Sequence, residues 1–380
     1  MTTDSIRVTV GDRPFGGGPL RAQVEGFDGV TFLDLMDVKT GRSMTAQLAR
    51  TGEESSIEWI ENPLDKGAIK SYSIRPRDGA THMGGVRFHE SDGLLDIVVN
   101  GRDFTTYYHG VDVARPYFHP LLEPGGRSLT RGFPMVADAA GETSDHPHHR
   151  GFWTAYGEVN EFDNWSEAEG HGRTVHRGFE LVEEGTIFGR IVALGDWTDA
   201  DGNVLMSERR DVKIYATNPH ILVDIDLTLT AVDDDVEFGD TKEGGFVSVR
   251  VASSMDVPRG GRIENSEGAV GEDAIWGKRA SWCDYSGPVT GKTMGIALFD
   301  HPENIGHPTY WHSRNYGLMT ANPFGRSTFE EDAAPGGHTL AACDSLRLRY
   351  RAHIHQGDAT KGAVAARYAG YIAPPVVEAS

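Results

Sequence analysis

Cysteine is scarce in this sequence: Cys283 and Cys343 are the two cysteines among 380 residues. Two thiols are too few for a disulfide scaffold or a zinc site built from thiolates. Long apolar runs are also missing, so no stretch would span a bilayer as a helix. The opening residues, MTTDSIRVTV, lack the basic and then apolar pattern of a secretion signal. These absences predict a soluble, cytoplasmic protein.

Positive charge is in short supply as well. The chain has 36 Lys and Arg residues against 56 Asp and Glu residues, which gives a formal net charge of −20. Such a charge repels phosphate backbones and anionic membranes, so we expect neither a nucleic acid nor a membrane as partner. The sequence contains no glycine-rich phosphate loop that opens a helix and no G-x-S-x-G elbow. The pattern makes no prediction of oligomeric state.

What the sequence has instead is glycine, with 47 residues, and alternating apolar residues between the glycines. Residues 220–232, HILVDIDLTLTAV, place Asp and Thr side chains on one face and Ile and Leu on the other, as in a half-buried strand. Residues 344–357 repeat the alternation, with Arg and His on the face opposite the apolar one. Turn residues at Asn100–Gly101 and within 179–215 predict hairpins. Residues 360–371 are the best helix candidate.

Long strands without alternating helices predict an all-β fold. We expect a large antiparallel β-sandwich with a concave sheet that holds the site. Turn residues cluster in RPRDGATHMGG (75–85), which we interpret as a domain boundary. The prediction is a small N-terminal β lobe over residues 1–80, followed by the main sandwich domain over residues 81–375.

The stretch SDHPHHRGFW crowds three imidazoles, His146, His148 and His149, ahead of Arg150 and Trp153. In an extended chain, His146, His148 and Arg150 would face one way, and His149 and Trp153 the other. The proline after the first histidine removes a ladder bond, which places the cluster at a strand entrance or edge. Such a cluster fits a metal site, an acid/base pocket or a solvated turn. Three imidazoles are costly to desolvate for structure alone, which favours a site.

Three further clusters carry chemical groups. His119 lies in the turn-rich YFHPLLEPGG, and Lys242 and Glu243 precede a Gly-Gly pair where a ligand can approach the backbone. A Glu there would be a base whose pKa partial burial raises. The segment HPTYWHSRNYGLMTANPFG combines aromatic faces with donors and amides that suit sugar rings. Its members are His307, Tyr310, Trp311, His312, Arg314, Asn315 and Asn322. The structural alternatives are a capped loop histidine, an exposed charged turn and an aromatic loop packed on the sheet.

Several long blocks of the sequence carry a family resemblance, among them HPHHRGFW, TKEGGFVSVRVA, WGKRASWCDYSG and GIALFDHPENIGHPTYWHSRNYGLMTANPFG. They resemble the PmoA-like family, a bacterial domain of unknown function. The resemblance implies the β-supersandwich fold of galactose mutarotases and polysaccharide lyases, and a role in carbohydrate catabolism. In mutarotase-like sites a histidine acts as acid and a glutamate as base. The matching residues here are His148 or His149 with Glu243, and His119 or His312 in support.

We therefore predict a carbohydrate-active enzyme that moves a proton at a sugar carbon or ring oxygen. Elimination, epimerisation and glycosidic cleavage all fit, on a small-molecule or oligosaccharide substrate such as a keto-glycoside. A keto group acidifies the neighbouring C–H, so a neutral His or a Glu accepts that proton near pH 7. Arg150 or Arg314 would hold the developing oxyanion. Trp153, Lys242 and the aromatic and amide residues of the 307–325 segment would bind the sugar.

No cofactor or metal is expected, because Arg150 would share a face with His146 and His148 and would repel a cation. One alternative is an enzyme that depends on a divalent metal, held by His146, His148 and a more distant His or Glu. Another is a non-catalytic sugar-binding module, which would need the aromatic segment but not the imidazoles.

Overall fold

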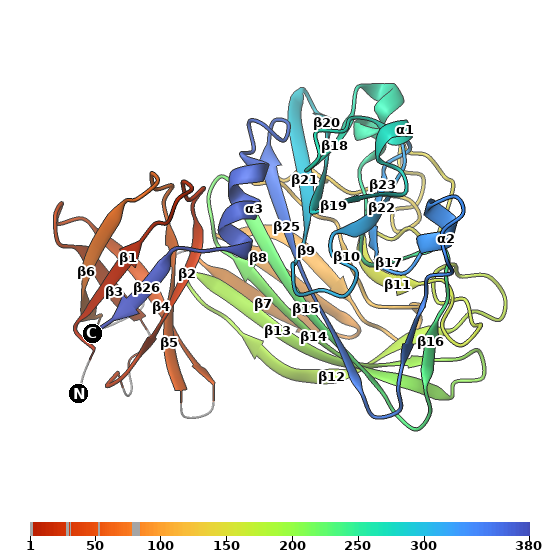
Figure 1. Cartoon of the computed structure of the whole chain (residues 1–380), viewed down its shortest axis with the longest axis horizontal. Helices are drawn as coiled ribbons and strands as arrows, with labels where there is room; N and C mark the ends of the chain where they lie inside the picture. The colour runs from red at the N-terminus through yellow and green to blue at the C-terminus, as the bar shows by residue number, and fades with distance from the viewer. Residues whose placement is uncertain (1–2, 28–29, 31, 52–53, 78–83) are drawn as a thin grey trace.

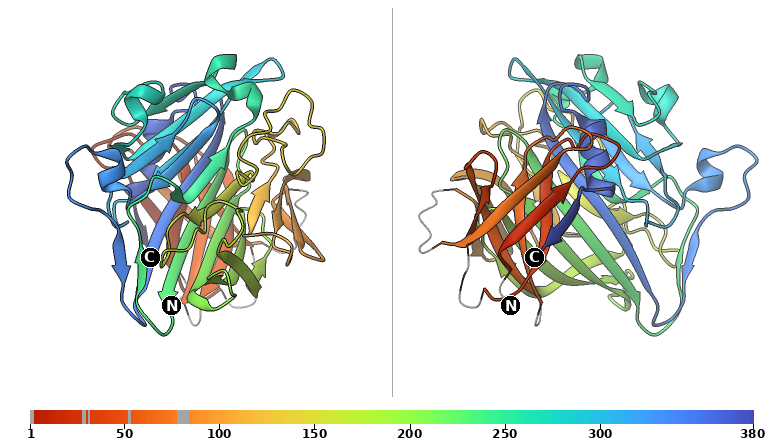
Figure 2. Two further views of the ribbon diagram at one scale, coloured as in Figure 1. Left: turned by 90° about the vertical axis from the view of Figure 1, so that its right-hand side faces the viewer. Right: turned by 60° about the vertical axis from the view of Figure 1, so that its left-hand side comes forward.

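The computed structural model describes residues 3–27, 30, 32–51, 54–77 and 84–380. Over these ranges the chain forms three large antiparallel sheets, a two-stranded sheet and a few short helices. Figures 1 and 2 show a seven-stranded sheet beside a sandwich of the two larger sheets. The predicted all-β sandwich is confirmed.

The seven-stranded sheet takes its strands from both ends of the chain. In spatial order they are β2 (Gly18–Val24), β5 (Glu54–Glu61), β4 (Ser43–Thr51), β3 (Phe32–Asp37), β6 (Ile69–Pro76), β1 (Ser5–Thr9) and β26 (Val376–Ala379). The two edge strands, β2 and β26, contact each other, so the sheet curls around its own core, which includes Trp59 and Tyr72. Both chain ends lie on this sheet (Figure 1). Within the predicted boundary region, residues 78–83 lie outside the described residues.

The sandwich consists of a nine-stranded and an eight-stranded sheet. The nine strands, in spatial order, are β19 (Lys278–Ala280), β22 (Thr309–Ser313), β23 (Leu318–Asn322), β17 (Gly244–Arg250), β11 (Phe152–Tyr156), β10 (Tyr117–His119), β9 (Arg102–Tyr108), β8 (Leu94–Val99) and β7 (Val86–Ser91). The eight strands are β12 (Arg173–Glu183), β13 (Phe188–Thr198), β14 (Val204–Tyr215), β15 (Ile221–Ala231), β25 (Ser345–Gln356), β21 (Lys292–Asp300), β20 (Trp282–Val289) and β18 (Arg262–Asn265).

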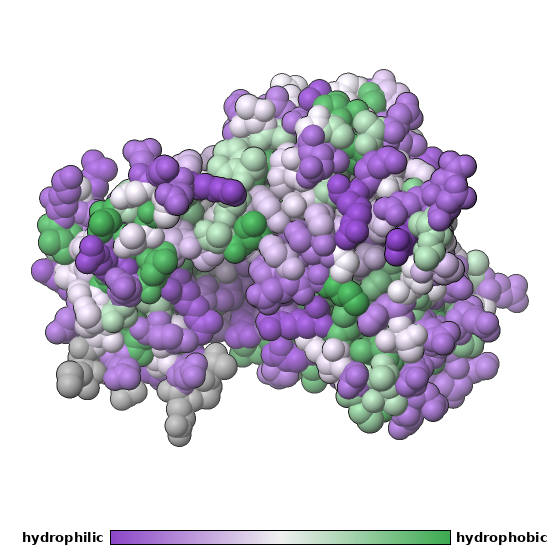
Figure 3. All heavy atoms as spheres, viewed as in Figure 1, coloured by the Kyte–Doolittle hydropathy of each residue, from purple (hydrophilic) through white to green (hydrophobic). Residues whose placement is uncertain are grey.

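Small elements complete the fold. They are the paired strands β16 (Val236–Phe238) and β24 (His338–Leu340), the helices α1 (Glu272–Ile275), α2 (Arg326–Phe329) and α3 (Val364–Ile372), and two 3-10 turns, η1 (Ser253–Met255) and η2 (Val257–Arg259). The helix predicted over 360–371 is α3. No helix in the described ranges is long and apolar enough to cross a membrane. Figure 3 shows polar side chains over most of one face of the molecule.

The sandwich core contains apolar side chains from both larger sheets. Val249 of β17 belongs to the same buried cluster as Ile225 of β15 and Leu348 of β25. This confirms the alternation predicted for 220–232 and 344–357. Full burial of such a side chain stabilises a fold by about 1.5–3 kcal/mol. The turn between β8 and β9 is Asn100–Gly101, with positive φ at both residues, as the hairpin prediction requires.

The opposite face of β25 is buried at its C-terminal end, because α3 packs over it. His353 and His355 are both 0% exposed, and α3 residues such as Val364 and Tyr368 join a small apolar cluster with Phe299 of β21. His355 Nε2 lies 2.7 Å from a carboxylate oxygen of Asp284, whereas neither ring nitrogen of His353 has a partner in the described chain. The face of β25 that the sequence predicted to be polar is therefore buried at this end and carries titratable histidines.

The buried histidines predict a loss of stability on mild acidification. Burial lowers the pKa of His353 well below its usual value and that of His220 to about 4. An unfolded histidine titrates near 6.5, so the unfolded chain binds protons that the folded chain does not accept as pH falls from about 6.5 toward 4. We expect the urea midpoint of unfolding to decrease when the pH is lowered from 7.5 to 5.5. Replacing His353 by Leu should remove about 1.4 kcal/mol of that loss.

The matched control is the exposed His89, replaced by Gln. This variant should lose as much stability between the two pH values as the unmodified protein. Equal pH dependence in the His353→Leu variant and the parent would show that His353 is not held neutral by burial.

Candidate active site

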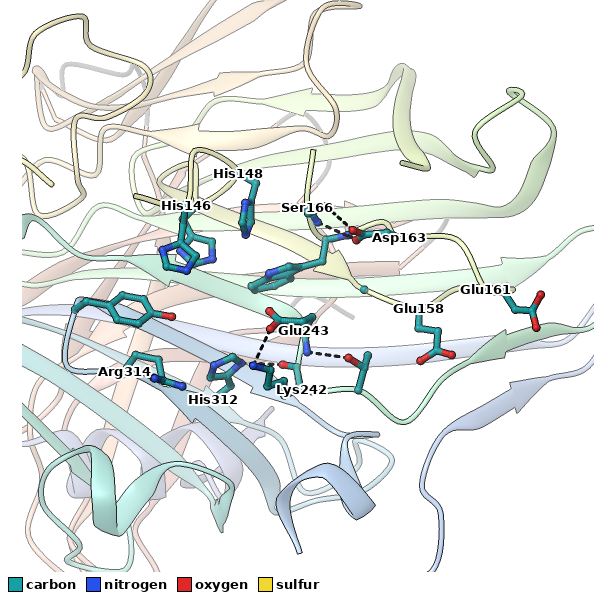
Figure 4. A pocket seen from close by; sticks show the side chains of 15 residues that line it. His146, His148, Glu158, Glu161, Asp163, Ser166, Lys242, Glu243, His312 and Arg314 are labelled. Carbon is teal, nitrogen blue, oxygen red and sulfur yellow. Dashed lines mark hydrogen bonds and ion pairs between the residues drawn. The ribbon is translucent and has the colours of Figure 1, made fainter. Parts of the chain in front are cut away.

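A cavity of about 750 Å³ lies against the nine-stranded sheet. Four segments line it: the loop before β11 (146–149), the loop after β11 (157–166), the residues just before β17 (241–243) and the β22–β23 hairpin (312–316). The strands β22, β23, β17 and β11 are neighbours in the sheet, and this order brings the four segments together. Figure 4 shows the side chains that face the cavity.

The cavity gathers most of the predicted acid/base residues. His148, His149, Glu243 and His312 all line it. Glu243 lies close enough to His148 and to His312 to influence the pKa of both imidazoles. In Figure 4, Glu243 and His312 extend from one side of the cavity and His148 from the other. Three of the four clusters singled out in the sequence therefore contribute to one pocket.

The histidine segment is a turn and not an extended strand. His146 has a φ of 44°, and its carbonyl oxygen accepts a hydrogen bond from the His149 N–H at 3.1 Å. The rings of His146 and His149 stack at 4.8 Å, with the His148 ring 4.4 Å from that of His149. The predicted division of these side chains between two faces is wrong, because the left-handed residue reverses the chain and all three imidazoles reach one cavity.

Two buried guanidinium groups hold this turn. Arg250 of β17 and Arg131 are both 0% exposed, and each donates to Asp145 Oδ1, at 2.8 and 2.6 Å. Arg131 also donates to the carbonyl oxygen of His146 at 2.8 Å. Burial alone would raise the pKa of Asp145. The charge of Arg250 and the hydrogen bonds that Asp145 makes to its neighbours outweigh burial and lower that pKa to about 2. The carboxylate thus ties the turn to the sheet.

The same arginine fixes the tautomer of His149. Arg250 Nη1 lies 3.1 Å from His149 Nδ1, and a guanidinium group can only donate. Nδ1 therefore accepts, and the proton of the neutral ring resides on Nε2. Burial, together with the neighbouring His148 and Arg250, lowers the pKa of His149 well below its usual value. His149 is therefore a neutral hydrogen-bond donor.

His312 has the opposite tautomer. Its Nδ1 lies 2.8 Å from the carbonyl oxygen of Lys242, which can only accept, so Nδ1 carries the proton. Nε2 then presents a lone pair. Burial lowers the pKa of His312 to about 4, which leaves the ring neutral at pH 7. Burial also lowers the pKa of His148 to about 4, and Arg115 adds to the effect.

Glu243 is a carboxylate that lines the cavity together with these imidazoles. Its side chain is 43% exposed and forms an ion pair of 3.2 Å with Lys242. Its carbonyl oxygen accepts a hydrogen bond of 2.6 Å from the N–H of Gly157, at the end of β11. A Cβ at Gly157 would lie 2.2 Å from that oxygen, so only glycine allows β11 and Glu243 to approach this closely.

Three predicted residues near β10 and β11 do not line the cavity. His119 is buried beside Thr130, where burial lowers its pKa to about 4. Arg150 makes two hydrogen bonds to Glu167, at 2.8 and 2.7 Å, and is not free for a substrate. Trp153 is buried beneath His149, with ring centroids 5.4 Å apart. Trp153 and Arg150 thus support the loops around the pocket.

Four members of the 307–325 segment also lie outside the cavity. Trp311 alternates with His312 on β22, so it faces the sandwich core. The Tyr310 hydroxyl donates to Glu330, and the Asn315 N–H to Glu272. Asn322 donates to the carbonyl oxygen of Thr241 at 2.7 Å and so braces the residues before Glu243. The structure does not bring these four residues into the cavity, because strand alternation and local hydrogen bonds engage them elsewhere, and their role as sugar contacts stays a prediction.

The loop after β11 supplies residues that the sequence reasoning missed. Glu158, Glu161, Asp163 and Trp165 line the cavity. Asp163 accepts hydrogen bonds from the backbone N–H groups of Trp165 and Ser166, which shapes this loop. The signal that would have found them is the concentration of carboxylates around a tryptophan directly after a buried strand.

The predicted metal ligands are adjacent but differently engaged. His146 and His148 have ring centroids 5.8 Å apart with planes inclined at 73°. His146 Nδ1 lies 2.8 Å from Asp145 Oδ2, and neither ring nitrogen of His148 has a partner within the described chain. Among the residues that the structure describes, no three His, Cys, Asp or Glu side chains form a group suited to a metal ion. In the metal-dependent alternative, the metal ion would bind His146 Nε2 and a ring nitrogen of His148.

The fold and the cavity define an all-β sandwich protein with an imidazole-rich polar pocket. The chain belongs to a family of unknown function (DUF6807), whose profile matches residues 94–369. The family model that matches is not named PmoA-like, so the resemblance to the PmoA-like family stays a prediction. No protein with a curated description matches the sequence. The crystal structure of the alpha-galactosidase from Lactobacillus brevis is similar over 72% of this chain, with 9% identity and a TM-score of 0.35; the match spans 39% of that enzyme.

The assigned tautomer of His149 is directly testable. Nitrogen-15 NMR of the histidine rings should show His149 protonated at Nε2 and not titrating between pH 8 and 5. Replacing Arg250 by Met removes the donor at Nδ1 and a nearby positive charge, so the pKa of His149 should rise.

Arg131→Met is the matched control, because it removes an equally buried guanidinium group that does not contact His149. It should leave the Nε2–H tautomer in place. An Nδ1–H signal for His149 in the unmodified protein would contradict the assignment.

Proposed function

We propose that this protein is a carbohydrate-active enzyme that transfers a proton on a sugar or keto-glycoside. The observation that carries the proposal is the set of groups in one cavity: a partly exposed carboxylate, Glu243, beside imidazoles of opposite tautomer, His149 and His312. Perturbed imidazoles gathered in a cleft are typical of catalytic sites. Their hydrogen bonds give each ring one defined role.

The arrangement suits removal of a proton from a carbon next to a carbonyl group. Glu243 would take the proton, and the electron pair of the C–H bond would move onto the carbonyl oxygen. The N–H of His149 would donate to that oxygen; a neutral imidazole is a known electrophile in this chemistry. Return of the proton on the other face gives epimerisation, and departure of a substituent from the next carbon gives elimination.

The remaining groups suit a sugar ring. Trp165 and Tyr316 contribute to the lining of the cavity, and His312 Nε2 provides an acceptor for a hydroxyl group. A cavity of about 750 Å³ falls within the range of small-molecule sites. The sequence resemblance to sugar-active β-supersandwich proteins also supports a carbohydrate substrate. Catalysis by these residues needs no cofactor.

Loss of the proposed base should remove most of the turnover. Replacing Glu243 by Gln, or His148 or His149 by Ala, should lower kcat by two to four orders of magnitude, about the contribution of a positioned acid or base. The assay is turnover of a panel of glycosides and their ring-oxidised keto forms. Urea midpoints should change little for Glu243→Gln, because this side chain is 43% exposed.

Glu267→Gln is the matched control, because this exposed carboxylate lies outside the cavity. It should retain full activity. Near-normal rates for all three site variants on a confirmed substrate would overturn the assignment. If the parent protein bound sugars without turning them over, and the site variants bound them equally well, the protein would instead be a binding module.

Metal dependence separates this proposal from its alternative. After exhaustive chelation, activity should be unchanged, and His146→Gln should retain it, because proton transfer by Glu243 assigns no role to His146. Elemental analysis of the purified protein is the second measurement. Stoichiometric zinc, manganese, iron or nickel, with activity lost on chelation and restored by the ion, would make His146 and His148 ligands.

A further inference from the structure

We propose that the pocket selects uncharged sugars and rejects sugar acids and sugar phosphates. This inference rests on the proposed function and names its substrate class. It comes from the charges that line the cavity and from the partners that each charge already has.

Both cationic side chains of the cavity are neutralised by the protein itself. The Arg314 Nε lies 2.9 Å from a carboxylate oxygen of Glu272, and Lys242 forms its ion pair with Glu243 at 3.2 Å. A carboxylate or phosphate of a substrate would have to displace one of these partners. The sequence prediction that Arg314 holds an anion therefore loses its main physical support.

The other predicted anion-binding residue, Arg150, is engaged in the same way. Glu167 accepts two hydrogen bonds from Arg150 and lies 3.6 Å from Arg115. This carboxylate therefore forms ion pairs with both guanidinium groups beside the pocket. Neither arginine lines the cavity.

Negative charge in the cavity is not compensated to the same extent. Four carboxylates line it against two cations. Asp163 is satisfied by hydrogen bonds within its own loop. Glu158 and Glu161 are exposed and have no cationic partner in the described chain. An anionic ligand would approach these two charges directly, and the net charge of −20 on the whole chain adds to the repulsion.

The uncharged groups of the pocket are suited to hydroxyl groups. The cavity offers hydrogen-bonding groups on uncharged rings, from His149 and from His312. His149 offers an N–H, and His312 Nε2 a lone pair. A sugar hydroxyl donates and accepts, so it satisfies each of these groups without bringing in charge. The unpaired carboxylates of Glu158 and Glu161 accept from hydroxyl groups at the rim.

Binding to matched sugars tests the proposal. Isothermal calorimetry at low ionic strength would compare methyl glycosides of glucose, galactose and mannose with their 6-carboxylate and 6-phosphate counterparts. We expect the best-bound parent sugar to bind about tenfold more tightly than its carboxylate form, with the ratio shrinking as salt is added. In a Glu158→Gln/Glu161→Gln variant the ratio should fall to about two, because the two repelling charges are gone.

The double variant Glu25→Gln/Asp65→Asn is the control, because it removes two exposed carboxylates beside the seven-stranded sheet and changes the net charge equally. Its ratio should stay about tenfold. Tighter binding of a carboxylate or phosphate form than of its parent would overturn the charge selection, whether or not the protein turns it over. Failure of every sugar to bind would overturn the sugar assignment and this inference together.

Discussion

The carboxylate of Asp145, held between the guanidinium groups of Arg131 and Arg250, determines the geometry of the pocket. Two fully buried cations this close repel each other, and Arg250 contributes to the lowered pKa of Arg131. Asp145 relieves that repulsion, and in doing so it fixes the turn that carries three imidazoles. Because Arg250 also donates from Nη1 to His149 Nδ1, the same cluster decides which nitrogen of that ring keeps its proton. A structural charge cluster thus sets a chemical property of the site.

The sheet supplies the rest of the positioning. Strands β11, β17, β23 and β22 are neighbours in the sheet, and their order brings the loops on both sides of β11 to the residues before β17 and to the β22–β23 hairpin. Gly157 allows β11 to pass within hydrogen-bond distance of Glu243, and Asn322 braces the residues before it. Catalytic side chains on rigid strand ends keep their geometry better than those on free loops.

The sequence predicted the fold better than the site, for physical reasons. Alternation of apolar residues is a local property, so 220–232 and the turn at Asn100–Gly101 could be identified without knowledge of the tertiary structure. Glu243 was also visible, because glycines follow it. The partners of charged groups are not local: Glu167 neutralises Arg150 from 17 residues away, and Arg250 reaches a histidine 101 residues before it. No spacing rule in one sequence reveals such pairs.

Hydrogen exchange at the substrate carbon tests the account most directly. A ring-oxidised methyl glycoside would be incubated with the protein in D₂O, and deuterium uptake at the carbon next to the ketone would be followed by proton NMR. The account predicts exchange with the parent protein, with or without chelator, and exchange at the uncatalysed rate with Glu243→Gln. Exchange by the Glu243→Gln variant as fast as by the parent, or exchange that disappears when metal is removed, would contradict it.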